Sequence, residues 1–373
     1  KQFEKELNNF ENEINRFDYG IKLLEKHTQL RKAFELMNKT FQVNSQVYNS
    51  SRLFQIVFIV LQIPDIAVSE YTETIIDKSQ IDKVDLLYFP TGGGKTEAFL
   101  GVSIFTLFFD RIRNKDFGNS VIIKYPLRLL SVQQLDRLMK LLVVAEKIRK
   151  EEKITGGEEF SLGYYVGKKN TPNNLENREL EKVSSLTDES LENEYKIIDK
   201  CPACNEKLKL ELEASDNSIN HICTNNSCEI DKLPLYIVDY QIYAKLPSII
   251  IATVDKLAAV GYNKRFQKIL GRVKSKCEKH GYFNVSRCPL CDKELISVNS
   301  DKASPSLLIQ DEVHLLNESL GVYASHYEKF IDYYLSNLQD KKIKHIAATA
   351  TVSGADPHLL HLYGKGNNLF PCK

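Results

Sequence analysis

The chain has 373 residues, of which 43% are hydrophobic and 27% are charged, a composition typical of a folded protein with a buried core. Its formal net charge of +1 excludes binding to nucleic acid through overall charge, so any such contact needs a local basic patch. The longest apolar runs are much shorter than the roughly 20 residues that a membrane-spanning helix needs, which predicts no membrane partner.

Residues 1–50 are predicted to form a helical segment. Seven hydrophobic residues recur at alternating spacings of four and three, which places them on one stripe of a helix: Phe3, Leu7, Phe10, Ile14, Phe17, Ile21 and Leu24. The stripe predicts a helix packed on its own domain, and a coiled-coil partner is the alternative. Gly20 is expected to interrupt the pattern.

From residue 51 the pattern changes to short apolar runs separated by helical stretches. Six of these runs are predicted to be strands: 85–89, 121–126, 160–167, 248–254, 306–312 and 343–350. Continuous apolar strands that alternate with helices indicate a parallel sheet with helices on both faces, an α/β fold. We therefore predict one α/β domain made from three parts of the chain, residues 51–167, 236–263 and 301–373.

Two polar stretches interrupt this domain and are predicted to be insertions, residues 168–235 and residues 264–300. Within the first stretch, residues 171–194 have the low-complexity composition of a solvated linker. The insertions hold all but one of the cysteines. Their composition therefore predicts small units that need something other than a hydrophobic core to fold.

The cysteines predict two zinc sites, because close-set pairs favour zinc in a reducing compartment over disulfides. The first set has the ligand spacing of a zinc ribbon: Cys201, Cys204, Cys223 and Cys228. In the second set a histidine takes the place of a missing cysteine: Cys277, His280, Cys288 and Cys291. Closed tetrahedral sites of this kind have a structural role.

Residues 88–101, YFPTGGGKTEAFLG, are predicted to bind phosphate. Glycines after an apolar run let backbone N–H groups converge on a phosphate, and the helix that follows points its positive end at the same place. We expect Lys95 to act as a catalytic residue on the β- and γ-phosphates of ATP, and the Thr96 hydroxyl to hold Mg²⁺. The predicted ATP-binding residues of this segment are Thr91, Gly92, Gly93, Gly94, Lys95, Thr96 and Glu97.

A second catalytic segment is predicted at residues 307–316, LLIQDEVHLL, an apolar strand that ends in two acids. We expect Asp311 to hold Mg²⁺, directly or through water. Glu312 is expected to orient and deprotonate the attacking water. Together with the phosphate loop, this segment predicts hydrolysis of the nucleotide as well as binding.

Residues 347–354, AATATVSG, follow a further predicted strand. Thr349 and Thr351 are expected to hydrogen-bond to the D-E-V-H segment and, with His314, to couple it to the state of the nucleotide. The phosphate loop, D-E-V-H and T-A-T in this order resemble the first motor domain of superfamily 2 helicases and translocases. The resemblance implies a RecA-like fold.

The superfamily resemblance implies further site residues. Gln55 of SRLFQIVF matches the adenine-reading segment, with Arg52 nearby. Two later segments, 125–138 and 251–257, match segments that touch nucleic acid, and the implied contacts are Arg128, Gln133, Thr253 and Lys256. The lysine-rich patch at 264–279 is expected either to contact DNA or to be an ordinary solvated face.

Several stretches, among them RLFQIVFIVLQIP, VDLLYFPTGGGKTEAFLG and PSIIIATVDKLA, resemble the large helicase of DISARM-type bacterial phage-defence systems. The family implies an ATP-dependent DNA motor of the bacterial cytoplasm, with a second motor domain and defence-system subunits as partners. A second domain supplies an arginine finger worth about 10³ to 10⁵ in rate. We therefore expect this chain to be a fragment that binds ATP and Mg²⁺ but hydrolyses ATP slowly. The alternatives are an RNA-directed motor, or a zinc-bearing nucleic-acid-binding module that uses ATP as a switch.

Overall fold

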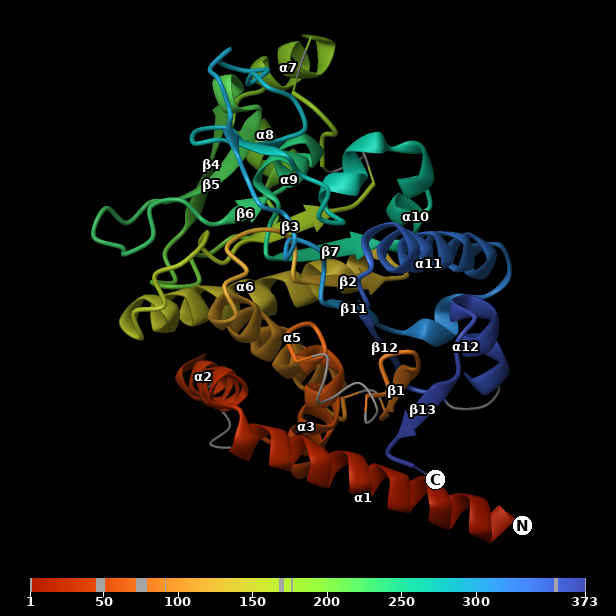
Figure 1. Cartoon of the computed structure of the whole chain (residues 1–373). Helices are drawn as coiled ribbons and strands as arrows, with labels where there is room; N and C mark the ends of the chain where they lie inside the picture. The colour runs from red at the N-terminus through yellow and green to blue at the C-terminus, as the bar shows by residue number, and fades with distance from the viewer. Residues whose placement is uncertain are drawn as a thin grey trace. The chain divides into compact units, whose positions relative to one another are not determined.

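The computed structural model describes residues 2–44, 51–71, 79–90, 92–167, 171–175, 177–351 and 355–372 (Figure 1). The chain divides into two compact units. The first contains Lys1–Lys115, Ile148–Gly156 and Ser306–Lys373, and the second contains Asp116–Lys147 and Gly157–Pro305. None of the helices that the structure describes combines the length and the hydropathy of a membrane span.

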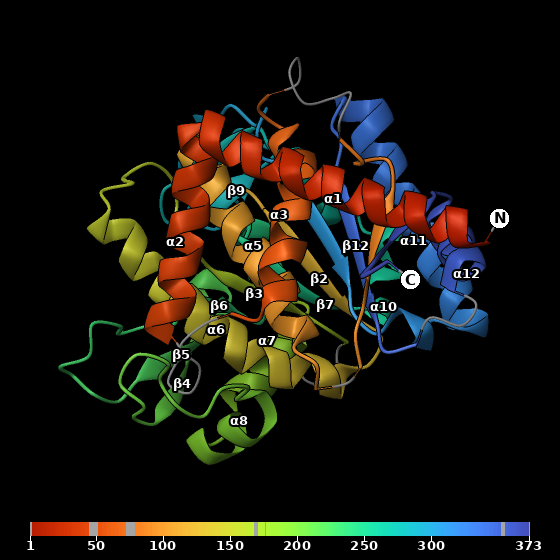
Figure 2. The same cartoon turned by 90° about the horizontal axis from the view of Figure 1, so that it is seen from below.

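The first unit is built on four parallel strands. In sheet order they are β13 (Asn367–Phe370), β1 (Val84–Tyr88), β12 (Lys344–Thr349) and β11 (Leu307–Gln310). Helices cover both faces, with α3 (Leu53–Ala67) and α5 (Lys95–Ile112) on one and α11 (Glu318–Gln339) and α12 (Ala355–Tyr363) on the other (Figure 2). Because both faces are covered, β11 and β12 are buried along their whole length.

The predicted N-terminal helical segment consists of two helices, α1 (Gln2–Lys26) and α2 (Thr28–Asn44). The predicted interruption at Gly20 is wrong, because Gly20 lies within α1 and the break falls at His27. Gly20 instead lets α1 approach α3 closely, since an added Cβ would lie 2.5 Å from the carbonyl oxygen of Val60. The glycine therefore serves helix packing and not helix termination.

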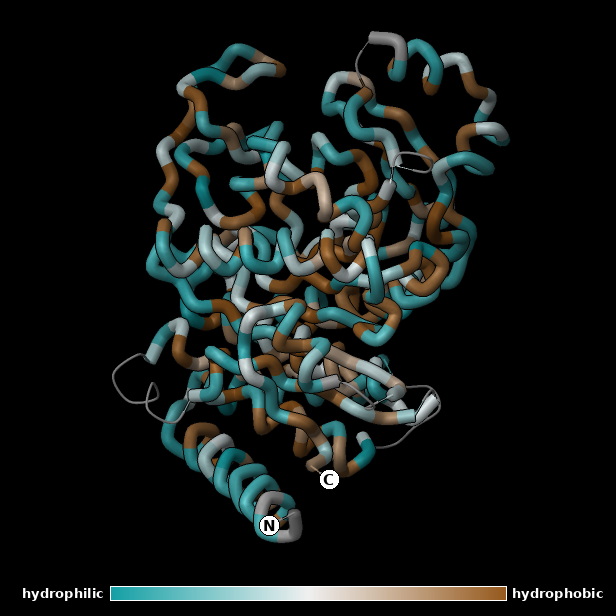
Figure 3. The backbone as a smooth tube through the Cα atoms, turned by 90° about the vertical axis from the view of Figure 1, so that its right-hand side faces the viewer, coloured by the Kyte–Doolittle hydropathy of each residue, from teal (hydrophilic) through white to brown (hydrophobic). Residues whose placement is uncertain are grey.

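The hydrophobic stripe of α1 is buried only toward the end of the helix. Leu23 and Leu24 are buried, whereas Leu7, Phe10 and Ile14 are 45%, 52% and 50% exposed. Figure 3 shows hydrophobic and hydrophilic residues alternating along the helix that leads away from the N-terminus. The predicted packing of this stripe on its own domain is confirmed for its last turns.

Four charged side chains form a buried network that joins α1, α3, β1 and β12. Arg16 donates to both carboxylate oxygens of Asp85, at 3.0 Å and 2.8 Å. Lys344 Nζ lies 2.7 Å from Asp85 and also pairs with Asp65. The Lys344, Asp65 and Asp85 side chains are at most 1% exposed, so each charge depends on the others for the solvation that water would otherwise supply.

Replacing Lys344 with methionine is expected to lower the free energy of unfolding by about 3 to 5 kcal/mol, because two buried carboxylates lose a partner. The matched control is Lys342→Met, which removes a lysine two residues away whose ion pair with Asp82 is largely exposed. That change is expected to cost less than about 1 kcal/mol. Urea unfolding measures both, and equal losses in the two variants would contradict the buried network.

The second unit is also built on four parallel strands. In sheet order they are β2 (Val121–Tyr125), β7 (Ile249–Thr253), β3 (Leu162–Tyr165) and β6 (Leu235–Tyr236). Three of its helices are α6 (Arg128–Glu151), α9 (Asp239–Lys245) and α10 (Val254–Leu257). All six strands that the apolar runs predict are confirmed, and the α/β fold with parallel strands is confirmed with them.

The cysteine-bearing stretches of the second unit form small elements of their own. The first has helices α7 (Asn177–Ser184) and α8 (Asp188–Tyr195), then a hairpin of β4 (Leu208–Glu213) and β5 (Ser218–Cys223) with the short η2 (Ala214–Asp216) between them. The second follows η3 (Val260–Tyr262) and η4 (Lys264–Lys268), and contains β8 (Ser275–Cys277), β9 (Gly281–Phe283) and β10 (Ile296–Ser297).

The prediction of a solvated linker at residues 171–194 is wrong. Helices α7 and α8 occupy most of this stretch, and Val183, Leu191 and Tyr195 are buried. The Thr187 side chain accepts a hydrogen bond from the Ser190 backbone N–H and so caps α8. A few buried apolar residues at helical spacing and one helix cap are therefore enough to order this stretch despite its polar composition.

Candidate functional site

The predicted phosphate loop lies between the end of β1 and the start of α5. Gly94 is the residue that precedes α5, and Gly92 and Gly94 have φ of 77° and 93°, a conformation that favours glycine. A Cβ at Gly93 would lie 2.8 Å from the Pro90 carbonyl oxygen. The turn therefore requires its glycines, and it leaves the N-terminus of an 18-residue helix facing the end of a buried strand.

Three other predicted residues belong to the same loop. Thr96 and Glu97 lie in the first turn of α5 and are half-buried. Thr91 lies outside the described residues. The Thr96 hydroxyl is thus carried by a helix start beside the glycine turn, the place from which a side chain holds a phosphate-bound magnesium ion.

Parallel pairing brings the two predicted catalytic segments together. Because β1 and β11 both pair with β12, their carboxyl ends lie at one edge of the sheet. Lys95 Nζ lies 3.2 Å from Glu312 Oε1, and the two side chains are only 7% and 19% exposed. The Glu312 backbone N–H donates to Asp311 Oδ1 at 2.9 Å. One ammonium group and two carboxylates therefore share a largely buried site.

The two acids at the end of β11 differ in their surroundings. Burial, followed by the charge of Glu312, raises the pKa of Asp311 to about 6. A buried carboxylate in this position gains from a nearby cation, because the cation stabilises its charged form. Glu312 has φ of 46°, a left-handed conformation that costs a non-glycine residue about 1–3 kcal/mol and is typical of functional sites.

The predicted adenine-reading segment contacts the predicted phosphate loop directly. Gln55 Nε2 donates to the Gly94 carbonyl oxygen at 3.0 Å, and Gln55 Oε1 accepts from the Arg52 backbone N–H at 2.8 Å. The Arg52 guanidinium donates to the Gly93 carbonyl oxygen at 2.6 Å. Two loop carbonyls are thus held by α3, which orients this backbone. The sequence indicates that Arg52 lies near Gln55, but it carries no signal for the bond to Gly93.

The three predicted coupling residues form a short hydrogen-bonded series. His314 lies in η5 (Val313–Leu315), and its Nδ1 is 3.4 Å from Glu312 Oε2 and 3.1 Å from Thr349 Oγ1. The Thr351 backbone N–H donates to Thr349 Oγ1 at 3.1 Å. The contacts therefore run from Glu312 through His314 to Thr349 at the end of β12, and Thr351 meets them through Thr349.

The residues with an implied nucleic-acid contact lie in the second unit and differ in accessibility. Gln133 is exposed on α6, and Arg128 is half-buried at the start of the same helix. Thr253, at the end of β7, is 2% exposed. Lys256 donates to Asp239 at 2.6 Å, and its side chain is 11% exposed. The structure thus engages Lys256 within the protein and leaves Gln133 on the surface.

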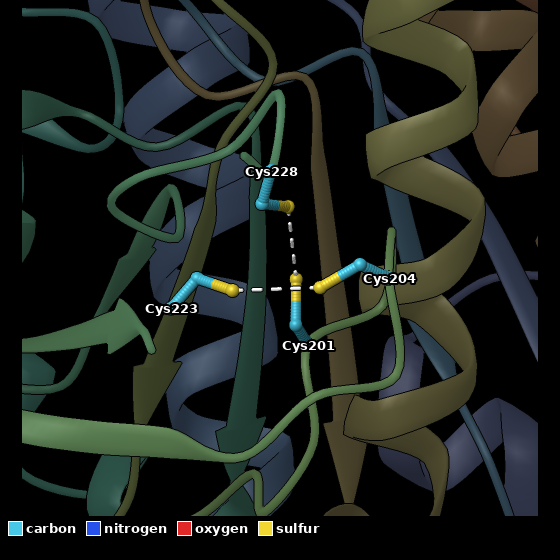
Figure 4. Close-up of side chains that lie close together, drawn as sticks. All are labelled: Cys201, Cys204, Cys223 and Cys228. Atoms are coloured by element: carbon cyan, nitrogen blue, oxygen red, sulfur yellow. Dashed lines mark hydrogen bonds between the residues drawn. The ribbon is translucent and has the colours of Figure 1, made fainter. Parts of the chain in front are cut away.

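The first cysteine set converges on one point. Cys201 Sγ lies 3.8 Å from Cys228 Sγ, and Cys204 Sγ lies 3.5 Å from Cys223 Sγ (Figure 4). All four sulfur atoms lie within 4.8 Å of one another. Thiolates bound at about 2.3 Å to one tetrahedral Zn²⁺ have sulfur–sulfur separations in this range. The donor set and its spacing therefore fit zinc.

The second set converges in the same way. His280 Nδ1 lies 3.2 Å from Cys288 Sγ, and Cys277 Sγ lies 3.8 Å from Cys291 Sγ. The four ligand atoms lie within 4.8 Å of one another. Three sulfur atoms and one imidazole nitrogen form a common tetrahedral zinc set. The histidine that spacing placed at the fourth position is thus beside the three cysteines.

Two of the four pairs of proposed zinc ligands share a turn geometry. In Cys201–Cys204 the Asn205 backbone N–H donates to the Cys201 carbonyl at 2.8 Å, and Asn205 has φ of 63°. In Cys288–Cys291 the Asp292 backbone N–H donates to the Cys288 carbonyl at 2.9 Å, and Asp292 has φ of 53°. Asparagine and aspartate tolerate this left-handed conformation better than most residues. Both turns therefore present two sulfur atoms to one side.

These observations define a class of protein. A glycine-rich loop at the end of β1 and paired acids at the end of β11 flank β12 in a parallel sheet, with helices on both faces. This arrangement is the RecA-like fold of superfamily 2 motor domains, and the two convergent cysteine sets are additions to it.

The similarity to a particular protein is close in sequence. The chain is 34% identical over 348 residues to the DISARM protein DrmA of Bacillus paralicheniformis. The alignment covers 84% of this chain and 30% of that protein, so the chain spans less than a third of the length of this relative. The resemblance to DISARM-type proteins is thereby confirmed. No family model matches the chain.

Solved helicase structures are similar at a lower level. The DUF1998 helicase MrfA bound to DNA is 11% identical with a TM-score of 0.42, and the match covers 90% of this chain and 29% of that one. The helicase Lhr of Mycobacterium smegmatis, bound to ssDNA and AMP-PNP, is 13% identical with a TM-score of 0.41, over 85% and 27%. The DEAD-box helicase Mss116, bound to ssRNA and UDP-BeF, is 14% identical with a TM-score of 0.41, over 84% and 42%.

Proposed function

We propose that the chain is the first motor domain of an ATP-dependent DNA helicase or translocase that acts in bacterial phage defence. The observation that carries the proposal is the ion pair of Lys95 with Glu312, beside Asp311, at neighbouring strand ends. Lys95 is more than 200 positions away from the two acids in the chain, and the three residues supply the charges that hydrolysis of a nucleoside triphosphate needs. The similarity to the DISARM protein DrmA supports the assignment to defence.

The residues of the site would divide the reaction among them. Lys95 would bind the β- and γ-phosphates, and its present partner Glu312 would then be free to orient and deprotonate the attacking water. Thr96 and Asp311 would hold Mg²⁺, which supplies charge neutralisation when bound. The internal ion pair keeps the two catalytic side chains largely buried and oriented at one edge of the sheet.

Binding of the nucleotide would be coupled to the rest of the motor through His314 and Thr349. The imidazole is within reach of both Glu312 and Thr349, so a movement of the glutamate changes the hydrogen bonds at the end of β12. Gln55 and Arg52 would link the adenine base and the phosphate loop to α3, so that a movement of either changes the hydrogen bonds at the start of this helix. These contacts are the physical basis we propose for coupling.

The two cysteine sets would each hold one structural Zn²⁺, within insertions at residues 168–235 and 264–300. Neither set has an open ligand position of the kind that a catalytic zinc needs, because four protein ligands already surround the point of convergence. A second motor domain of the same protein would supply the arginine finger, and nucleic acid would contact Arg128 and Gln133. We propose DNA as the nucleic acid, with RNA as the alternative.

The proposal is tested by Glu312→Gln in the full-length protein. We expect phosphate release to fall by at least about 10²-fold, because the general base is lost, while affinity for fluorescent ATP changes little. Undiminished hydrolysis would remove Glu312 from the reaction. Undiminished defence activity in a variant that no longer hydrolyses ATP would favour the alternative in which ATP acts only as a switch.

A further inference from the structure

The most exposed large hydrophobic side chain in the described part of the chain is Tyr262, which is 94% exposed. It ends η3, a few residues after β7 and α10, in the stretch that follows the second implied nucleic-acid segment. An exposed tyrosine offers an apolar face and a polar tip to a ligand. Because single exposed hydrophobic residues are common, a ligand for this ring is indicated only by how the ring is held and by what surrounds it.

The backbone that carries Tyr262 is held firmly. The backbone N–H groups of Tyr262 and Asn263 donate to the carbonyl groups of Ala259 and Val260, both at 3.1 Å. Just beyond, Phe266 is buried and its N–H donates to the Asn263 carbonyl at 2.9 Å. The exposure of the ring is thus a fixed feature of a structured turn.

Side chains beneath the turn hold it as well. Asn263 Nδ2 donates to the Tyr243 hydroxyl at 2.7 Å, and this hydroxyl lies 2.7 Å from the Tyr165 hydroxyl. Tyr165 lies at the end of β3, so the turn is tied to the strand ends of the second unit. A rigid support of this kind lowers the entropy that an aromatic ring loses when a ligand stacks on it.

The surroundings of the ring favour nucleic acid over protein. A Cβ added at Gly261 would meet no heavy atom within 4 Å, so one side of the turn is open. Lys264 and Arg265 follow, and both are exposed. Protein hot spots have a surrounding ring of contacts that excludes water, whereas single-stranded nucleic acid is bound by an aromatic ring for the base and cations for the phosphates.

We propose that Tyr262 stacks on one unpaired base of a single-stranded nucleic acid and that Lys264 contacts a phosphate next to that base. This inference rests on the proposed function and deepens it, because it assigns a base contact and a phosphate contact to two named residues at this turn. Every base has a flat face, so the contact carries little sequence preference.

The test measures binding of a fluorescent oligo-dT single strand and of a duplex by the 373-residue chain. Tyr262→Ala is expected to weaken single-strand binding roughly 5- to 150-fold and Tyr262→Phe to preserve it, because stacking needs the ring and not the hydroxyl. Lys264→Ala is expected to reduce the slope of log K against log salt by about 0.7. Tyr323→Ala, which removes an exposed tyrosine of the first unit, is the matched control and leaves binding unchanged.

A strand that carries 2-aminopurine gives a second readout. Stacking on Tyr262 is expected to quench its fluorescence on binding, and Tyr262→Ala to abolish the quenching. If the unaltered chain binds neither strand nor duplex, the proposed function fails. If the unaltered chain binds single strands and Tyr262→Ala binds them equally well, the stacking proposal is overturned. It is also overturned if Tyr262→Ala loses duplex binding to the same extent as single-strand binding. A protein partner would then be the remaining candidate for contact with the exposed ring.

Discussion

Replacing Lys95 with alanine is expected to weaken binding of ATP in the presence of Mg²⁺ by about 10- to 150-fold, the value of hydrogen bonds to a charged group. The ammonium group is 7% exposed at the start of α5, where it would meet the terminal phosphates. Its loss also leaves Glu312 without the cation that now lies 3.2 Å away, so the site becomes more repulsive to a polyanion. Titration with a fluorescent ATP analogue measures the effect.

The matched control for Lys95 is Lys83→Ala, at the opposite end of the same strand. Lys83 precedes β1, and its Nζ lies 3.5 Å from the Asn368 side chain, so its loss is expected to leave nucleotide affinity unchanged. Thermal unfolding of both variants without nucleotide separates a loss of binding from a loss of fold. Equal affinities of Lys95→Ala and the unaltered chain would show that the glycine loop does not bind the phosphates of ATP.

The strands could be predicted closely from the sequence, and the reason is physical. A strand covered on both faces is apolar throughout. The apolar run at 248–254 therefore predicts β7, and the run at 306–312 predicts β11. Among the parallel strands, the two that the sequence did not predict are β6 and β13, which are short and include polar or half-buried residues. Short edge strands depend on their neighbours, and no local pattern marks them.

The candidate site also has parts that could be predicted from the sequence and parts that could not. Lys95 and Glu312 could be placed together from the sequence, because the carboxyl ends of parallel strands share an edge. No pattern in the sequence indicates which residue a long cationic side chain will contact. Lys256, for which the resemblance implies a nucleic-acid contact, pairs with Asp239, and Arg52 reaches a carbonyl 41 positions away. Such contacts depend on how helices are packed, which periodicity does not determine.

Removal of zinc is expected to unfold the two cysteine-bearing elements and to leave the parallel strands protected. The second element shows why, since its buried cluster consists of Cys277, Phe283 and Cys288, and two of these three residues are proposed zinc ligands. So small a core cannot offset the entropy of ordering the stretch, whereas zinc binding contributes about 10 to 16 kcal/mol to such domains. Hydrogen exchange after chelation is expected to show loss of protection in β8 and β9 but not in β12.

Zinc content distinguishes the two sites with single substitutions. We expect two zinc ions in the unaltered chain and one zinc ion in each of the variants Cys204→Ser and Cys291→Ser. Serine is a poor zinc ligand, and each set has only four members. Cys372→Ser is the matched control, since this cysteine belongs to neither set and its loss is expected to leave both ions bound. A full complement of zinc in Cys204→Ser would show that the first sulfur cluster holds no metal.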